Sequence, residues 1–116
     1  MNHYTQRFER FVARFSGHEE VVARMAGLFL QDAPRRLDEI DSGYRERDWE
    51  RVITAAHSLV NIAGTMQAFE AAEQARKLEA AVRARAYAEI PQLSSCLQSD
   101  LQQALQVVHS YSEASV

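Results

Sequence analysis

The sequence predicts an all-α fold, an antiparallel up-down-up-down four-helix bundle with a short additional N-terminal helix. Apolar residues recur every three or four positions through most of the chain, as they do on the buried face of a helix. Segments that alternate between apolar and polar residues and are bounded by turn residues are absent, so no strand is expected. Short connections between four long amphipathic segments favour antiparallel neighbours.

A short helix is expected first, with Thr5 as its N-cap and an end near Ser16 and Gly17. We expect this helix to cap one end of the bundle with an aromatic face. The residues of that face follow helical spacing and are Phe8, Phe11, Val12 and Phe15.

The second helix is expected to begin at Glu19 and Glu20, whose carboxylates suit the positive end of a helix, and to stop near Ser42 and Gly43. Pro34 removes a backbone donor from this segment, so it either kinks one long helix or splits it into two pieces. The apolar stripe keeps its phase across Pro34, which favours one kinked helix. That stripe consists of Val22, Met25, Phe29, Ala33, Leu37 and Ile40.

The third helix is expected to follow Asp48 as its N-cap and to run to about Thr65. Each helical residue turns by about 100°, which aligns the apolar side chains of this segment in one buried seam. His57 lies about 140° from the centre of the seam, so its imidazole should face solvent on a helix that is locked into the core. The seam consists of Trp49, Val52, Ala56, Leu59, Ala63 and Met66.

Two further helices complete the predicted bundle. A weakly patterned junction at residues 84–88 separates them, and Pro91 stands where the first turn of a helix tolerates proline. The fourth helix carries a stripe of Phe69, Ala72, Ala75, Leu78 and Val82. The fifth carries Leu93, Leu97, Leu101, Ala104, Val108 and Tyr111.

The composition indicates a single domain over residues 1–116 that can bury a core without disulfides or metal. A formal net charge of -3 argues against a general attraction to nucleic acid or to anionic membranes. Cys96 is the only cysteine, and no segment resembles a signal peptide or a membrane span. We therefore expect a cytoplasmic monomer whose partners are proteins.

Motifs of most enzyme classes are missing, including the Gly-rich phosphate loop, Cys-x-x-Cys, His-Glu-x-x-His and the nucleophile elbow. The four histidines lie on separate elements, so no metal site and no cofactor is expected. An exposed histidine on a helix is most often a solvated side chain without a special role. His57 differs in its surroundings, because Ile53 and Val60 flank it and Asn61 and Gly64 lie one turn further on, a surface that suits docking.

Four segments resemble the histidine-containing phosphotransfer (HPt) domain family: FLQDAP at 29–34, DW at 48–49, AHSLVNIAGT at 56–65 and ARKLE at 75–79. The resemblance implies a phosphorelay intermediate in which His57 accepts a phosphoryl group from a receiver-domain aspartate through Nε2. It also implies transfer to the receiver of a response regulator, with hybrid sensor kinases upstream. Such a protein is a phosphocarrier without autonomous catalytic activity, and the Mg²⁺ of the reaction belongs to the receiver.

Two positions depart from the family's pattern, which has Lys three residues and Gly four residues after the histidine. Val60 and Asn61 occupy these positions here. In the family the Lys helps to hold the phosphoryl charge and the Gly lets a partner approach. A degenerate helical adaptor, which binds receivers or other proteins without phosphotransfer, is therefore the alternative.

A cation on the fourth helix could replace the missing Lys. Reflecting the third helix onto the fourth, through a turn near Met66 and Gln67, brings His57 level with about residue 76. Arg76 and Lys77 stand there and could stabilise the phosphoryl group. The simpler interpretation is that both only solvate the surface.

Overall fold

The computed structural model describes residues 3–114, which form helices joined by short turns and contain no strand. The all-helical class predicted from the sequence is confirmed. In chain order the elements are α1 (His3–Ala13), α2 (Glu19–Arg45), α3 (Trp49–Thr65), α4 (Phe69–Arg83), the 3₁₀ turn η1 (Tyr87–Glu89) and α5 (Ile90–Ala114).

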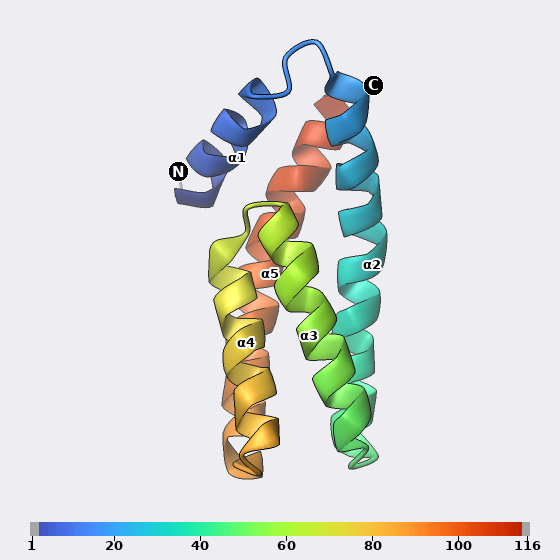
Figure 1. The fold of residues 1–116 in the computed structure, drawn as a ribbon, viewed down its shortest axis with the longest axis vertical. Coiled ribbons are helices and arrows are strands. Elements are labelled where there is room, and N and C mark those ends of the chain that lie inside the picture. Colours follow the sequence, from blue (N-terminus) through green and yellow to red (C-terminus); the bar gives the residue numbers. More distant parts are fainter. Residues whose placement is uncertain (1–2, 115–116) are drawn as a thin grey trace.

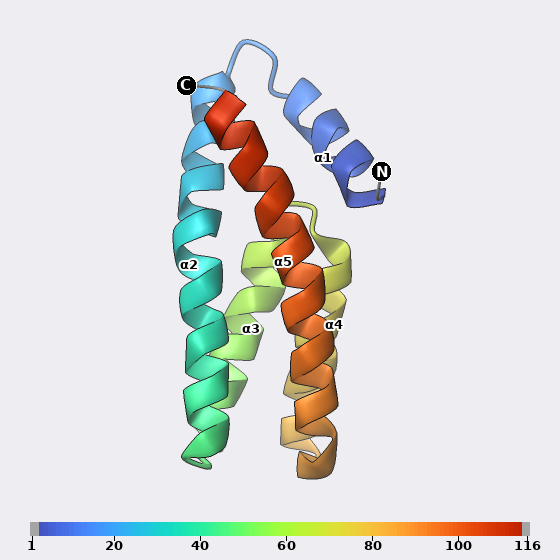
Figure 2. The ribbon, with the colours of Figure 1, turned by 180° about the vertical axis from the view of Figure 1, so that it is seen from behind.

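The four long helices pack side by side, each against two neighbours: α3 lies against α2 and α4, and α5 closes the arrangement against α4 and α2. Each helix returns along the preceding one (Figure 1). The view from behind shows that α2 and α5 extend past the α3–α4 turn (Figure 2). The short helix α1 lies over that turn, beside the projecting end of α5 (Figures 1 and 2).

The core is a single cluster of apolar side chains at the centre of the bundle, and no polar side chain is buried in the described part of the chain. The predicted seam of α3 is buried except for Trp49, which is half-buried and stacks on Tyr87 with ring centroids 4.2 Å apart. The largest of the almost wholly enclosed side chains are Phe29, Leu59, Met66, Leu78, Ile90, Leu97, Leu101, Val22, Val52 and Val108.

The end of the second helix was predicted wrongly. α2 continues past Gly43 to Arg45, and the chain turns at Arg47, which has a φ of 57°. Gly43 is buried inside the helix because α3 approaches it closely: a Cβ added there would lie 2.9 Å from Cγ2 of Val52. The glycine therefore permits a helix contact and does not end the helix. Pro34 lies within one continuous helix, so the split into two pieces is excluded.

The start of α3 agrees with the sequence, because the side chain of Asp48 accepts a hydrogen bond from the backbone N–H of Arg51 at 3.3 Å. For α1 the expected boundaries were wrong. Thr5 lies inside the helix, which ends at Ala13, and a turn with Gly17 at a φ of 88° leads into α2.

Helix α1 is fastened to the α3–α4 turn by polar contacts. The hydroxyl of Tyr4 donates to the backbone oxygen of Met66 at 3.0 Å, and Arg7 donates to that of Gln67 at 2.7 Å. Arg7 also pairs with Glu70 at 2.8 Å and lies over the ring of Phe69, 4.9 Å from its centroid. Phe69 was predicted in the core, but it is 49% exposed because it serves as a surface platform for Arg7.

We predict that Leu59→Ala destabilises the bundle by about 2–5 kcal/mol, because it leaves a cavity at a fully buried position of α3. Urea unfolding measures the effect. Asn61→Ala on the exposed side of the same helix is the control and should change the free energy of unfolding by less than about 0.5 kcal/mol. Equal effects of the two substitutions would mean that the helix is rotated from the orientation described.

Candidate functional site

His57 stands on the exposed side of α3, as its position relative to the apolar seam predicts. Its side chain is 62% exposed, while Ala56 and Leu59 beside it in the sequence are fully buried. The helix beneath the imidazole is therefore held in the core on its opposite face. A ring presented in this way is accessible to another protein and is carried by a rigid element.

Glu79 of α4 contacts the imidazole from the neighbouring helix. Its Oε1 lies 3.2 Å from Nδ1 of His57, and its Oε2 accepts hydrogen bonds from Nε and Nη2 of Arg83 at 3.2 and 3.0 Å. The Glu79 side chain is only 15% exposed, so packing restricts it. One carboxylate thus joins the histidine on α3 to an arginine one turn further along α4.

The hydrogen bond determines which ring nitrogen is free. A carboxylate can only accept, so Nδ1 carries the proton when it bonds to Glu79. In the neutral ring the lone pair is then on Nε2, the nitrogen that does not face Glu79. The site therefore presents an unprotonated imidazole nitrogen for attack on an electrophile.

Glu79 remains a carboxylate despite its partial burial. Burial by itself would raise the pKa of Glu79, because it penalises the charged form. Hydrogen bonds from Arg83 and His57 favour the charged form and outweigh burial, so the pKa of Glu79 lies below its ordinary value. The site consequently holds a fixed negative charge next to the ring at neutral pH.

The residues expected to flank His57 lie along α3. Ile53 and Val60 are half-buried and pack against the core cluster, whereas Asn61 is exposed. At Gly64 an added Cβ would meet no atom within 4 Å, so open space adjoins this glycine. These residues and the ring of His57 form one surface of α3, which has little side-chain bulk at its Gly64 end.

The register between α3 and α4 differs from the expected one. His57 meets Glu79, about one turn beyond the position near residue 76 that reflection through the turn predicts. Arg76 instead pairs with Glu73 on its own helix. Lys77 lies two residues before Glu79, which is about 160° around α4, and so it points away from the contact with α3.

Neither Glu79 nor Arg83 was predicted from the sequence as part of the site. The only signal in the sequence is their spacing of four residues, which places a carboxylate and a guanidinium on one face of a helix. Such pairs are common on helix surfaces and do not indicate a site. Only the packing of α3 against α4 identifies this pair as the neighbour of His57.

Comparison with protein families adds a decisive observation. The Hpt domain family matches residues 24–110, which include most of α2, all of α3 and α4, and most of α5. The chain belongs to the Hpt domain family. No curated protein and no solved structure matches it. Hpt domains are phosphocarrier modules that act in phosphorelays together with receiver domains, so membership connects the exposed histidine to phosphotransfer.

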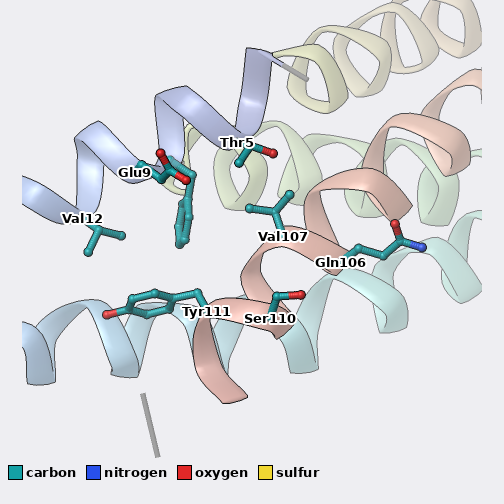
Figure 3. Close-up of a pocket in the computed structure, with 8 residues that line it drawn as sticks. Thr5, Glu9, Val12, Gln106, Val107, Ser110 and Tyr111 are labelled. Carbon is teal, nitrogen blue, oxygen red and sulfur yellow. The ribbon is translucent and has the colours of Figure 1, made fainter. Parts of the chain in front are cut away.

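The Hpt match excludes α1, and this helix forms a separate feature. A cavity of about 550 Å³ lies between α1 and α5, with Val12, Val107 and Tyr111 among its apolar walls (Figure 3). None of its lining residues belongs to α3 or α4. The cavity is therefore distinct from the surface around His57.

No group of three or more His, Cys, Asp and Glu side chains within residues 3–114 is arranged to hold a metal ion. None of the helices in the same range combines the length and the apolar character that crossing a membrane requires.

We predict that the contribution of Glu79 to stability is lost in acid. Because the pKa of Glu79 is lower in the folded chain than its ordinary 4.5, the unfolded chain takes up the proton first as the pH falls. The difference in free energy of unfolding between wild type and Glu79→Gln should be constant near neutral pH and shrink as the pH falls through 4.5 and below. Urea unfolding at a series of pH values tests this. A difference that does not vary with pH would contradict the charged network.

Proposed function

We propose that this Hpt domain is a phosphorelay intermediate. His57 accepts a phosphoryl group on Nε2 from a receiver-domain aspartate of a hybrid sensor kinase and passes it to the receiver of a response regulator. The protein acts as a cytoplasmic, monomeric antiparallel up-down-up-down bundle, and as a phosphocarrier without catalytic activity of its own. The observation that carries the proposal is the exposed His57 with Nδ1 bonded to Glu79.

The transfer step needs one nucleophile from this chain. The Nε2 lone pair forms a bond to phosphorus, the bond between phosphorus and the aspartate oxygen breaks, and its electron pair leaves with the aspartate carboxylate. The proton on Nδ1 stays on the ring, which becomes positively charged while it carries the phosphoryl group. Glu79 is placed to stabilise that positive ring, because its carboxylate already accepts from Nδ1.

The remaining requirements of phosphoryl transfer fall on the receiver. Transfer of this kind depends mainly on positioning and on stabilisation of charge, and the receiver's acidic pocket with its Mg²⁺ supplies both for the aspartyl phosphate. No cofactor on this chain enters the proposal. After transfer the same surface meets a second receiver, and the reaction runs in the opposite direction.

Docking requires a surface that the receiver can approach closely. We assign this role to Ile53, Val60, Asn61 and Gly64, which lie on α3 around the histidine. Two are half-buried apolar side chains, and the open space next to Gly64 would admit the edge of a partner. Arg76 and Lys77 stay untested as ligands of the phosphoryl group, and the pairing of Arg76 with Glu73 gives that role little support.

The alternative function is that of an adaptor that binds receivers or other proteins without phosphotransfer. The presence of Val60 and Asn61, where the family resemblance implies Lys and Gly, favours this alternative. The orientation of the ring by Glu79 favours transfer, because an adaptor has no need of a free Nε2. Chemistry at His57 separates the two.

We predict that His57→Ala abolishes phosphorylation by a phosphorylated receiver and leaves the bundle folded, because the side chain lies outside the core. His109→Ala is a matched control, since the His109 side chain is also 62% exposed and pairs with a glutamate, Glu113. Acid-labile phosphate on the protein is the readout. Phosphorylation retained in His57→Ala would overturn the assignment of His57 as the phosphorylated residue. If the wild type and both variants bind the receiver but acquire no phosphate, the adaptor function is favoured.

We also predict that Gly64→Gln slows transfer from the receiver by about tenfold or more, because a side chain there obstructs close docking. It should not destabilise the free protein, since an added Cβ meets no atom and Gln favours the helix over Gly. Gly27→Gln on α2 is the matched control, because a Cβ there is equally free of contacts. Equal transfer rates in the two variants would place the docking surface elsewhere.

A further inference from the structure

A phosphoryl group on His57 would find no positive charge within one turn of it on its own helix. The side chains one turn before and one turn after His57 on α3 are Ile53, Thr54, Val60 and Asn61, and all are uncharged. A phosphoryl group carries a charge of roughly -1.5 to -2 at neutral pH, by analogy with phosphorylated hydroxyl side chains. The nearby carboxylate of Glu79 adds negative charge to the same site. We therefore expect compensation from α4, the helix that contacts His57 through Glu79.

Helix α4 carries three cations beyond its first turn, and their positions differ. Lys77 lies about 160° around the helix from Glu79. Arg76 pairs with Glu73 on its own helix. Arg83 lies four residues after Glu79, only about 40° away around the helix, and contacts the same carboxylate that contacts His57. Of the three, Arg83 alone shares a hydrogen-bonding partner with the histidine.

We propose that Arg83 is the phosphoryl-binding residue of this site and that phosphorylation of His57 draws its guanidinium from Glu79 onto the phosphoryl oxygens. This inference rests on the proposed function, because it concerns the phosphorylated form of His57. Arg83 holds Glu79 in the unphosphorylated protein and the phosphoryl group in the phosphorylated one. Glu79 keeps its hydrogen bond to Nδ1 in both states.

The exchange is favoured by the different freedom of the two side chains. The Arg83 side chain is 60% exposed and long, whereas the Glu79 side chain is 15% exposed and fixed by packing. An exposed ion pair is weak, so little opposes its opening. The phosphoryl group offers more negative charge and three acceptor oxygens, which a guanidinium can bind with two parallel hydrogen bonds.

The exchange also explains how a carboxylate can adjoin a phosphorylation site. Before phosphorylation, Arg83 balances the charge of Glu79. Afterwards the positively charged ring balances Glu79 through Nδ1–H, and Arg83 becomes available for the phosphoryl group. Positive and negative groups then alternate through the site in both states.

The test uses phosphoramidate as a small-molecule donor, so that no receiver is needed. The phosphorus–nitrogen bond of phosphoramidate breaks, ammonia leaves, and a bond to Nε2 of His57 forms. The variants are Arg83→Gln, Arg83→Lys and Arg76→Gln. The last is a matched control, because the Arg76 side chain is 58% exposed and also pairs with a glutamate on α4.

Phosphorus NMR titration of the phosphohistidine gives the first readout. A nearby cation favours the dianionic phosphoryl group, so Arg83→Gln should raise its second pKa by roughly one pH unit, Arg83→Lys should largely restore it, and Arg76→Gln should leave it unchanged. In the wild type, the Nε–H resonance of Arg83 should shift on phosphorylation and that of Arg76 should not. A purely structural role of Arg83 would move neither signal.

The outcomes separate this inference from the proposed function. Suppose that receivers phosphorylate His57 normally. If the phosphoryl pKa is then the same in Arg83→Gln and Arg76→Gln, or is raised only in Arg76→Gln, the proposed role of Arg83 is wrong and the relay function stands. If the Arg83 effect is found in the phosphoramidate product and no receiver transfers to His57, the proposed function fails and the cation remains identified. A His57 that phosphoramidate leaves unmodified would overturn the inference.

Discussion

The close packing of α3 against α4 is the contact on which the site depends. Both helices bury mainly small side chains where they face their neighbours, among them Ala55, Ala56 and Ala63 on α3, and Ala72 and Ala75 on α4. Small side chains let helix axes approach closely. The approach brings two surface residues of different helices, His57 and Glu79, within hydrogen-bonding distance. A bulkier residue in this interface would separate them without touching either one.

The same packing explains why a solvent-exposed histidine is nevertheless oriented. Most exposed side chains adopt several rotamers, and an exposed histidine can adopt either tautomer. An ion pair at the surface restricts them little. Glu79 is not such a freely exposed partner, because its side chain is largely covered. It keeps its charge because hydrogen bonds from Arg83 and His57 hold its pKa below the ordinary value. The carboxylate therefore acts as a fixed acceptor for Nδ1 and leaves Nε2 directed to the partner.

Much of the fold could be predicted from the sequence because helices have a short, regular period. The core faces of α3 and α5 follow directly from the spacing of apolar residues, and the cap at Asp48 follows from local chemistry. The end of α2 was predicted wrongly at Gly43, because the sequence does not distinguish a glycine that ends a helix from one that lets a neighbouring helix approach. Phe69 was predicted in the core because its position follows the apolar period of α4. That period does not indicate that Arg7 of another helix lies over the ring.

The site was predictable only in part, for a related reason. The orientation of His57 depends on one helix and was correct, whereas its neighbour on α4 depends on how far two helices slide along each other. Periodicity does not determine that register, and the error of about one turn directed attention to Arg76 in place of Glu79 and Arg83. The residues that tune a surface site are thus harder to find from sequence than the residue that reacts.

The position of the phosphoryl group on the imidazole ring tests the central claim most directly, because Glu79 leaves one nitrogen free and occupies the other. Phosphorus and nitrogen NMR of the protein phosphorylated by a receiver distinguishes the two phosphohistidine isomers, and peptide mapping locates the modified residue. The arrangement predicts a single phosphohistidine at His57, bonded through Nε2. A phosphoryl group on Nδ1, or on another histidine, would contradict it.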